Sequence, residues 1–257
     1  MRNLLIVGAQ RCGSTYLYKV LDDHPQVSMA HPVRPEPKFF MNDPWTAKGK
    51  DFYESTYFKD RKAGTLYLGE KSTSYIESPV AARRMRDFYP DARILMILRD
   101  PVLRAYSHYR FSVEHRLETL TFSEALNAEA ERLNRAEFST SVTPFAYRRR
   151  GNYIDYIVPY LDVFDASQLR VLIFEEFVGG VADVQALYRW LGVDDGFVPG
   201  SLHQVFNQAT GEKEEQGNAF RDLALGYRDS IGRLEAFLGR TLGGWREHHR
   251  GLCGMTV

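Results

Sequence analysis

A glycine-bounded turn between an apolar run and a helical pattern is the feature that most constrains this chain. Residues 4–7 predict a buried strand, and Gly8 and Gly13 bound the turn that follows it. Such a unit exposes backbone N–H groups and the positive end of a helix, which favours binding of phosphate or sulfate. The two glycines have the spacing of the P-loop, but Ser14 stands where that motif requires lysine, and the nearest cation is Arg11. We therefore expect a phosphorylated donor other than a nucleoside triphosphate with magnesium.

Composition limits the partners of the chain. Lys plus Arg and Asp plus Glu both count 33, so no net field recruits nucleic acid or an anionic membrane. No apolar run is long enough to span a bilayer, and no signal-peptide pattern precedes the first strand, so we expect a cytoplasmic protein with no integral membrane segment. Cys12 and Cys253 are expected to be free thiols in a reducing compartment. The length of 257 residues favours a single domain over residues 1–257.

Strands alternate with helices along the chain. The continuous apolar run 93–98 is typical of a strand buried on both faces of a parallel sheet. In the helix predicted over 79–89, Val80, Met85 and Phe88 are expected to face inward. The alternation predicts an α/β fold, a single P-loop-like doubly wound domain with a central parallel sheet flanked by helices. We predict strands at 4–7, 26–30, 65–70, 93–98 and 169–174, and helices at 14–21, 79–89, 154–164, 181–191 and 218–237, with further helices that begin after Asp100 and at Thr121.

Several charged residues follow directly on predicted strands. In a doubly wound sheet, ligands bind beyond the carboxyl ends of the strands. This rule brings the anion loop, Lys71, Arg99 and Glu175 to one edge. Ser107 lies in the helix that begins just after Arg99, so the two side chains could hold one phosphate from neighbouring sides. We therefore expect a donor with two phosphate groups, one bound at the loop and one at Arg99 and Ser107.

Two segments resemble the donor-binding motifs of the sulfotransferases that use 3′-phosphoadenosine 5′-phosphosulfate (PAPS). They are GAQRCGST at 8–15 and LRDPVLRAYSHY at 98–109. Between them, EPKFF at 36–40 and EKSTSY at 70–75 are similar to signatures of the branch that contains the heparan sulfate sulfotransferases and their bacterial relatives. The resemblance covers residues 4 to about 177. Beyond it, only Phe206-Asn207 followed by Gly211 is similar to the family loop that closes over the nucleotide.

The resemblance implies roles for individual residues. The loop would hold the 5′-phosphosulfate, and Arg99 with Ser107 would hold the 3′-phosphate. Glu36 would be the catalytic base, and Lys71 would lie beside the sulfuryl group. Arg11 keeps the charge of the usual lysine and a share in catalysis, but arginine can hardly donate a proton to the leaving group. The implied donor site consists of Arg11, Cys12, Gly13, Ser14, Thr15, Arg99 and Ser107.

The predicted enzyme is a PAPS-dependent sulfotransferase (EC 2.8.2 class) that needs no metal. Sulfuryl transfer to an alcohol requires a base near the attacking oxygen and cations where negative charge grows, which fixed arginine and lysine side chains supply. The expected partner is a small-molecule or glycan acceptor, whether carbohydrate, lipid or secondary metabolite, and not nucleic acid. Pro35 stands where many relatives carry a basic residue, which argues against a highly anionic acceptor.

Alternative interpretations remain open at this point. A P-loop small-molecule kinase would bind ATP with magnesium, and a non-catalytic nucleotide-binding protein would keep only the fold. His31 is an alternative base, because neutral imidazole suits proton abstraction. His108 and His115 are expected on a helix surface. The run Arg148, Arg149 and Arg150 fits either a solvated face or an anion contact, and Tyr147 and Tyr153 fit either a core or a nucleotide pocket.

Overall fold

The computed structural model of the chain describes residues 1–134, 143–206 and 217–254. The chain divides into two compact units, the first made of Met1–Arg99 with Ile157–Asn207 and the second of Asp100–Tyr156 with Gln208–Val257. That residues 1–257 form a single domain remains a prediction, which this division into units does not test.

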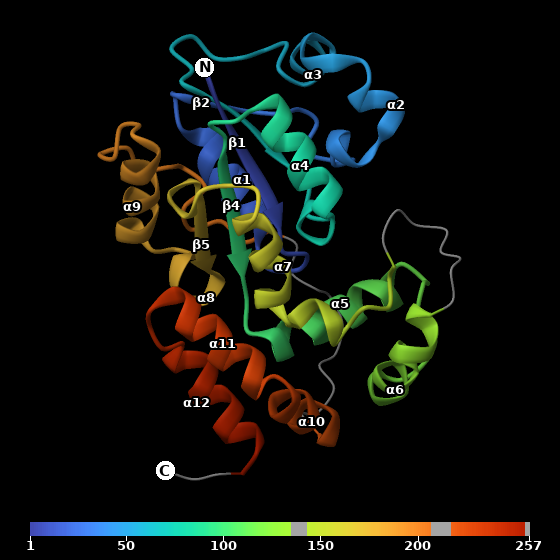
Figure 1. Ribbon diagram of the computed structural model, residues 1–257. Helices are drawn as coiled ribbons and strands as arrows, with labels where there is room; N and C mark the ends of the chain where they lie inside the picture. Colours follow the sequence, from blue (N-terminus) through green and yellow to red (C-terminus); the bar gives the residue numbers. More distant parts are fainter. Residues whose placement is uncertain (135–142, 207–216, 255–257) are drawn as a thin grey trace. The chain divides into compact units, whose positions relative to one another are not determined.

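A parallel sheet of five strands forms the centre of the first unit, in the order β2-β3-β1-β4-β5 (Figure 1). Each strand overlaps a predicted one. All carboxyl ends therefore lie at one edge, as predicted. The strands are β1 (Arg2–Gly8), β2 (Val27–Met29), β3 (Tyr67–Lys71), β4 (Arg93–Leu98) and β5 (Leu169–Ile173).

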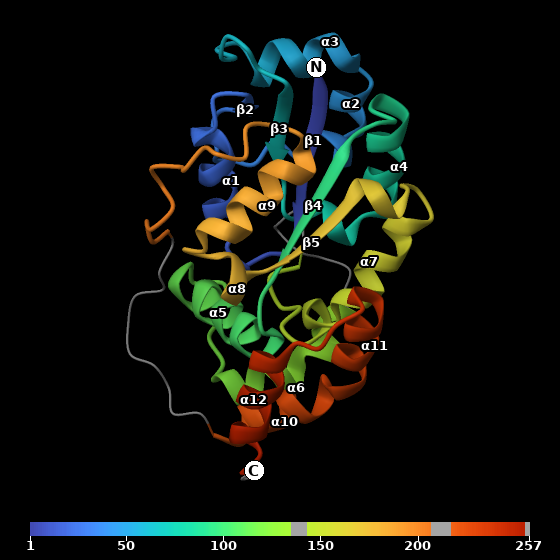
Figure 2. The same cartoon turned by 90° about the vertical axis from the view of Figure 1, so that its left-hand side faces the viewer.

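Helices cover both faces of this sheet (Figures 1 and 2). On one face α1 (Ser14–Asp23) packs with α9 (Val181–Leu191), and the hydroxyl of Tyr188 donates to the carbonyl of Val20 at 2.7 Å. On the other face lie α4 (Pro79–Phe88) and the part of α7 (Tyr153–Leu161) that begins at Ile157. The observed α/β fold is the predicted doubly wound arrangement.

The predicted inner face of α4 is partly wrong. Val80 is 45% exposed, whereas Met85 is fully buried and Phe88 is half-buried. The reason is the period of the helix: the buried stripe passes through Ala81, Ala82 and Met85, and Val80 in the first turn lies off that stripe.

Between β2 and β3 the chain forms short helices around an aromatic cluster. These helices are η1 (Phe39–Met41), α2 (Asp43–Thr46) and α3 (Gly49–Tyr57). The rings of Phe39 and Tyr53 lie 4.7 Å apart between centroids, and those of Phe40 and Tyr75 lie 5.8 Å apart. These contacts fix the segment 36–40 against the first unit's core.

The second unit is helical. Asp100 caps α5 (Pro101–Glu114), and Thr121 with Glu124 forms the predicted capping box of α6 (Phe122–Leu133). The helix predicted over 218–237 is two helices, α10 (Asn218–Gly226) and α11 (Arg228–Leu238), and α12 (Gly243–Leu252) was not predicted. The break falls at Tyr227, whose buried hydroxyl donates to the carbonyl of Arg148 at 2.9 Å. This tertiary contact has no signal in the local sequence.

The second unit also decides several open questions from the sequence. His108 is 4% exposed, so its predicted surface position is wrong, whereas His115 is exposed as predicted. The His108 ring packs 5.0 Å from the ring of Tyr147, and its Nε2 lies 3.4 Å from the buried guanidinium of Arg150. Tyr147 and Tyr153 are core residues. Of the three consecutive arginines, only Arg149 is exposed.

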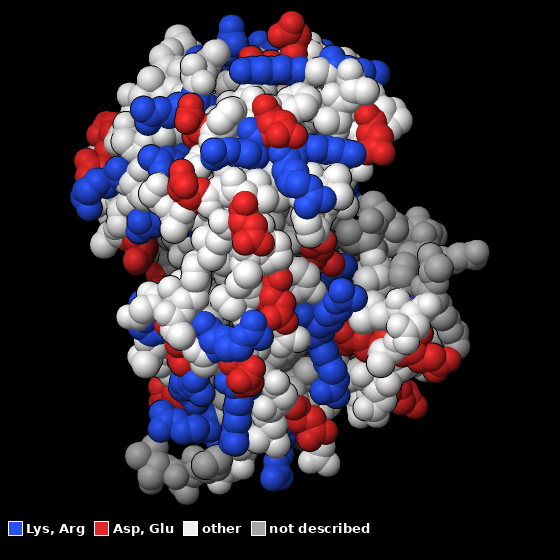
Figure 3. All heavy atoms as spheres, in the orientation of Figure 1, with Lys and Arg blue, Asp and Glu red and all other residues white. Residues whose placement is uncertain are grey.

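Basic and acidic side chains are interspersed over the face shown in Figure 3. Among the residues that the structure describes, no helix combines the length and the apolar character needed to cross a membrane. Cys12 and Cys253 are thiols and do not form a disulfide bond, as predicted.

Candidate active site

The predicted anion loop joins β1 to α1 in the first unit. Its backbone turns through the left-handed region at Arg11 (φ 65°) and again at Gly13 (φ 86°). Gly13 is the N-cap of α1 and provides no capping side chain, so the positive end of α1 opens onto the loop. Cys12 is fully buried, with Sγ 3.5 Å from the carbonyl of Gln10, and fills space inside the turn. This geometry suits an anion bound by backbone N–H groups.

One aromatic ring links this loop to the residue that follows β4. A Cβ atom added to Gly13 would lie 2.4 Å from the ring of Phe174, the first residue of α8 (Phe174–Phe177). The guanidinium carbon of Arg99 lies 5.2 Å from the centroid of the same ring. The ring of Phe174 thus lies against both the loop and Arg99. Sequence reasoning missed Phe174, because nothing in its neighbourhood marks it as a contact of a distant loop.

Glu36 and Lys71, the predicted base and its neighbouring cation, contact each other. The ammonium group of Lys71 donates to Glu36 Oε1 and is almost fully buried, whereas the Glu36 side chain is 17% exposed. Thr73 also holds this carboxylate, through its backbone N–H at 2.9 Å and its hydroxyl at 3.1 Å from Oε2. A fixed carboxylate that is still open to solvent is able to accept a proton from a bound hydroxyl.

The strand register places this pair beside the anion loop. Lys71 pairs with Ile6 of β1, and the N–H of Ser72 donates to the carbonyl of Ile6 at 3.1 Å. The loop begins at Gly8, shortly after Ile6 on the same strand. The predicted base and cation therefore lie at the sheet edge that carries the loop.

A second carboxylate, that of Glu70 next to Lys71 in β3, is buried, and sequence reasoning missed it. Glu70 is fully buried and accepts hydrogen bonds from the hydroxyls of Tyr53, Ser72 and Tyr75. Burial raises the pKa of the Glu70 carboxyl, and the three hydrogen bonds oppose that rise. Glu70 ends the strand predicted over 65–70, and the sequence assigned a role only to its neighbour Lys71.

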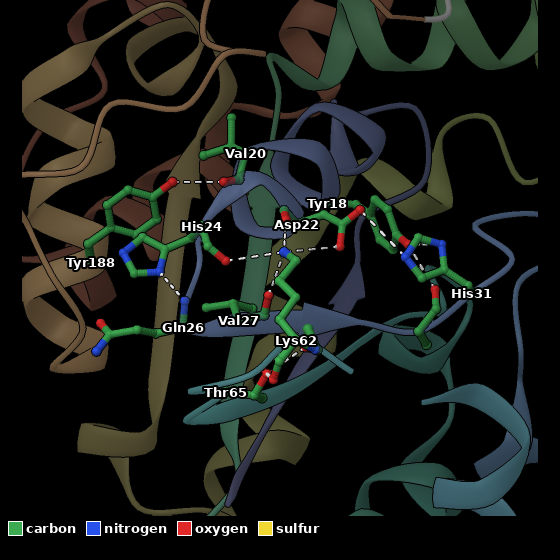
Figure 4. Close-up of polar contacts among 12 residues, drawn as sticks. Tyr18, Val20, Asp22, His24, Gln26, Val27, His31, Lys62, Thr65 and Tyr188 are labelled. Carbon is green, nitrogen blue, oxygen red and sulfur yellow. Dashed lines mark hydrogen bonds and ion pairs between the residues drawn. The ribbon is translucent and has the colours of Figure 1, made fainter. Parts of the chain in front are cut away.

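His31, the alternative base, is engaged elsewhere (Figure 4). Its Nδ1 lies 3.3 Å from the hydroxyl of Tyr18, and its Nε2 lies 3.6 Å from the carboxylate of Asp22. It borders a pocket of about 480 Å³ that Tyr57 and Lys62 also line. The contacts of His31 are thus separate from those of the Glu36 carboxylate.

The remaining residues that the sequence placed at the site lie on several elements of the two units. Glu175 is exposed on α8 in the first unit. Ser107 lies on α5 in the second unit, and its shared phosphate with Arg99 stays a prediction. Ser14 and Thr15 open α1. Asn207 and Gly211 lie outside the described residues, whereas Phe206 is described and packs its ring 6.4 Å from that of Tyr16.

One group of possible metal ligands occurs among the described residues, in the second unit. It consists of Asp100, His248 and His249. The Asp100 carboxylate already accepts the N–H groups of Val102 and Leu103 as the cap of α5. Burial alone would raise the pKa of Asp100, but the hydrogen bonds with His248 and His249 outweigh it and lower that pKa well below its ordinary value. This cluster ties α12 to the start of α5.

Known proteins resemble this chain in sequence. The sequence model described as "Sulfotransferase domain" matches residues 1–218. The bifunctional heparan sulfate N-deacetylase/N-sulfotransferase 1 of Caenorhabditis briggsae is 29% identical over 218 residues, which is 81% of this chain and 24% of that protein. The mouse protein of the same name is 34% identical over 176 residues, covering 66% of this chain and 19% of its own length. The chain thus spans about a quarter or less of these relatives.

Solved structures agree with the sequence comparison. The crystal structure of a sulfotransferase from Alicyclobacillus acidocaldarius has a TM-score of 0.77 and 33% identity, and the match covers 96% of this chain and 99% of that one. The sulfotransferase domain from the curacin biosynthetic pathway, at 16% identity and a TM-score of 0.51, shares the fold. Together with the family match over residues 1–218, these findings show that the chain belongs to the sulfotransferase family.

Proposed function

We propose that this sulfotransferase moves a sulfuryl group from PAPS to a hydroxyl of its acceptor, with Glu36 as the general base. The observation that carries the proposal is the Glu36 carboxylate, held by Lys71 and Thr73 at the edge of the sheet and still partly exposed. A base in this position removes the proton of the attacking hydroxyl as the new S–O bond forms. The acceptor is a carbohydrate, a lipid or a secondary metabolite.

The donor is held at two points in this proposal. The amides of the loop at Gly13, Ser14 and Thr15, with Arg11, bind the 5′-phosphosulfate, because the N-terminus of α1 and a guanidinium both favour an anion. Arg99, together with Ser107, binds the 3′-phosphate. Cys12 is part of the loop but supplies no nucleophile, since in-line attack by the acceptor needs none.

Positive side chains take the place that a metal occupies in phosphoryl transfer. Lys71 lies against the proposed base, where negative charge grows on the sulfuryl oxygens and on the bridging oxygen. Arg11 adds charge at the leaving phosphate but keeps its proton. The proton for the leaving group therefore comes from Lys71 or from water. The family match and Ser14 in the lysine position of the P-loop both favour this reaction over a kinase reaction.

The test of the base is Glu36→Gln, with Glu175→Gln as its control. Both changes remove one carboxylate of the first unit, but Glu175 is exposed on α8. We expect Glu36→Gln to abolish transfer of labelled sulfate while the affinity for adenosine 3′,5′-bisphosphate is kept, and Glu175→Gln to stay active. Unchanged turnover of Glu36→Gln would refute the base role.

The test of the donor compares heat shifts with two ligands. A ligand specific to the native state raises the midpoint of thermal unfolding by mass action. Adenosine 3′,5′-bisphosphate is expected to raise it, and ATP with magnesium is not. A shift with ATP and magnesium alone would reject PAPS as the donor in favour of a kinase.

A further inference from the structure

The buried carboxylate of Glu70 has no part in the mechanism above, yet three hydroxyl groups donate hydrogen bonds to it. Its side chain leaves β3 on the opposite side from that of the adjacent Lys71. Glu70 Oε1 accepts from the hydroxyls of Ser72 at 2.6 Å and Tyr75 at 2.7 Å, and Oε2 accepts from the hydroxyl of Tyr53 at 2.6 Å. We call these four residues the Glu70 network.

Each hydroxyl of this network has one proton to donate. Ser72 and Tyr75 donate theirs to Glu70 Oε1, so the lone pairs of their oxygens are left to accept. Two backbone N–H groups use them: Lys38 N donates to Ser72 Oγ at 2.9 Å, and Phe40 N donates to the hydroxyl of Tyr75 at 3.2 Å.

These two amides belong to the segment that carries Glu36. Lys38, between Glu36 and Phe40, has a left-handed backbone with φ 49°, a conformation that costs energy for a residue with a side chain. Such a conformation persists where the surroundings hold it, and here the bonds at Lys38 and Phe40 do so. The turn aims the chain so that Glu36 meets Lys71 and Thr73.

We infer that Glu70 is a positioning residue, which orients the Glu36 carboxylate through the hydroxyls of Ser72 and Tyr75 and the backbone of Lys38 and Phe40. This inference rests on the proposed function, because it concerns the placement of the base. Tyr53 has no such positioning role, because its hydroxyl contacts Glu70 but is not hydrogen-bonded to the backbone N–H of Lys38 or of Phe40.

The difference between the two tyrosines provides a matched test. Tyr53→Phe and Tyr75→Phe each remove one buried hydroxyl from Glu70, and both rings are fully buried. We expect Tyr75→Phe to lower kcat on the order of tenfold to a hundredfold, because the base is displaced from its attack geometry. Tyr53→Phe is expected to keep kcat. Both variants should bind adenosine 3′,5′-bisphosphate like the wild type, and their midpoints of thermal unfolding should be similar to each other.

A second pair tests Glu70 directly. Glu70→Gln can turn its amide so that its oxygen still accepts from Ser72 and Tyr75 and its NH₂ group donates to Tyr53, so most of the activity should remain. Glu70→Met removes both acceptor atoms, and kcat should fall as in Tyr75→Phe. If the methionine variant does not fold, the tyrosine pair decides the matter.

The outcomes separate the inference from the proposed function. Equal kcat values for Tyr53→Phe and Tyr75→Phe overturn the positioning role, even where Glu36→Gln is inactive. Full activity of Glu36→Gln instead overturns the base itself, whatever the tyrosine variants do. A fall in bisphosphate affinity in step with kcat would show that Tyr75→Phe disturbs the donor site, and would also overturn the inference.

Discussion

Replacing Gly13 by alanine tests how closely the donor loop is packed. The residue has φ 86°, where an alanine is strained by about 1–2 kcal/mol. In addition, the new Cβ would lie 2.4 Å from the Phe174 ring, and displacing a packed ring costs about 1–3 kcal/mol more. The sum predicts a loss of about 2–5 kcal/mol in the free energy of unfolding.

Gly192→Ala is the matched control for this change. Gly192 belongs to the same unit and has φ 72°, but within the described part of the chain no atom beyond its immediate chain neighbours lies within 4 Å of an added Cβ. It should lose only the backbone strain of about 1–2 kcal/mol. In thermal unfolding each kcal/mol corresponds to roughly 2–4 °C in a chain of this size. The difference between the two midpoints therefore measures the clash with Phe174.

The same change should also weaken donor binding, because the displaced ring supports Arg99. Calorimetric titration with adenosine 3′,5′-bisphosphate should show weaker binding to Gly13→Ala and wild-type binding to Gly192→Ala. Equal midpoints for the two variants, or unchanged bisphosphate affinity of Gly13→Ala, would refute the packing argument.

Two further predictions concern charge. Lys71→Met should lower turnover about 10²–10³-fold, because the growing charge on the sulfuryl group loses its cation. Adenosine 3′,5′-bisphosphate lacks the sulfuryl group, so Lys71→Met should bind it normally. Arg99→Ala should bind it weakly in the same titration. The lowered pKa of Asp100 contributes stability that is present above its unfolded value of about 4 and is lost as the pH falls through the folded pKa. Asp100→Asn should therefore lose less stability than the wild type between about pH 5 and pH 2, measured by denaturant unfolding.

The outcomes that would contradict these two predictions are distinct. Weak bisphosphate binding by Lys71→Met would move that lysine from the sulfuryl group to a phosphate. Parallel stability curves for Asp100→Asn and the wild type would show that the contacts with His248 and His249 do not stabilise the ionised carboxyl.

The sheet could be predicted because its strands are buried on both faces. The run 94–98 is apolar throughout, and the end of a strand fixes where Lys71 or Arg99 emerges. The prediction failed where burial depends on distant partners. The helix α12 begins with two glycines and has few apolar residues, and the long predicted helix is divided at Tyr227 by a contact with Arg148.

The candidate site shows the same division. Arg11, Glu36 and Lys71 stand in segments that resemble family motifs, and that resemblance implied a role for each of them. Glu70 and Phe174 do not, because a buried acid needs hydroxyl partners and a supporting ring needs a loop to rest on. Such partners come together only through the tertiary fold.

The two ends of α1 are stabilised differently, and Figure 4 shows contacts of the carbonyl groups at its carboxyl end. The carbonyl of Val20 accepts from Tyr188, that of Leu21 from the N–H of His24, and that of Asp22 from the ammonium of Lys62. The last turn has no basic residue of its own, so Lys62 supplies the charge that opposes the negative end of the helix dipole.

The amino end of α1 depends on what the loop binds. Its cap is a glycine, and its first turn contains no acidic residue. An anionic donor therefore adds the one charge that the helix lacks, so the amides of the first turn should exchange with deuterium more slowly when adenosine 3′,5′-bisphosphate is bound, whereas those near Lys62 should not change. Under the proposed function, the bound donor would act as the N-terminal cap of α1.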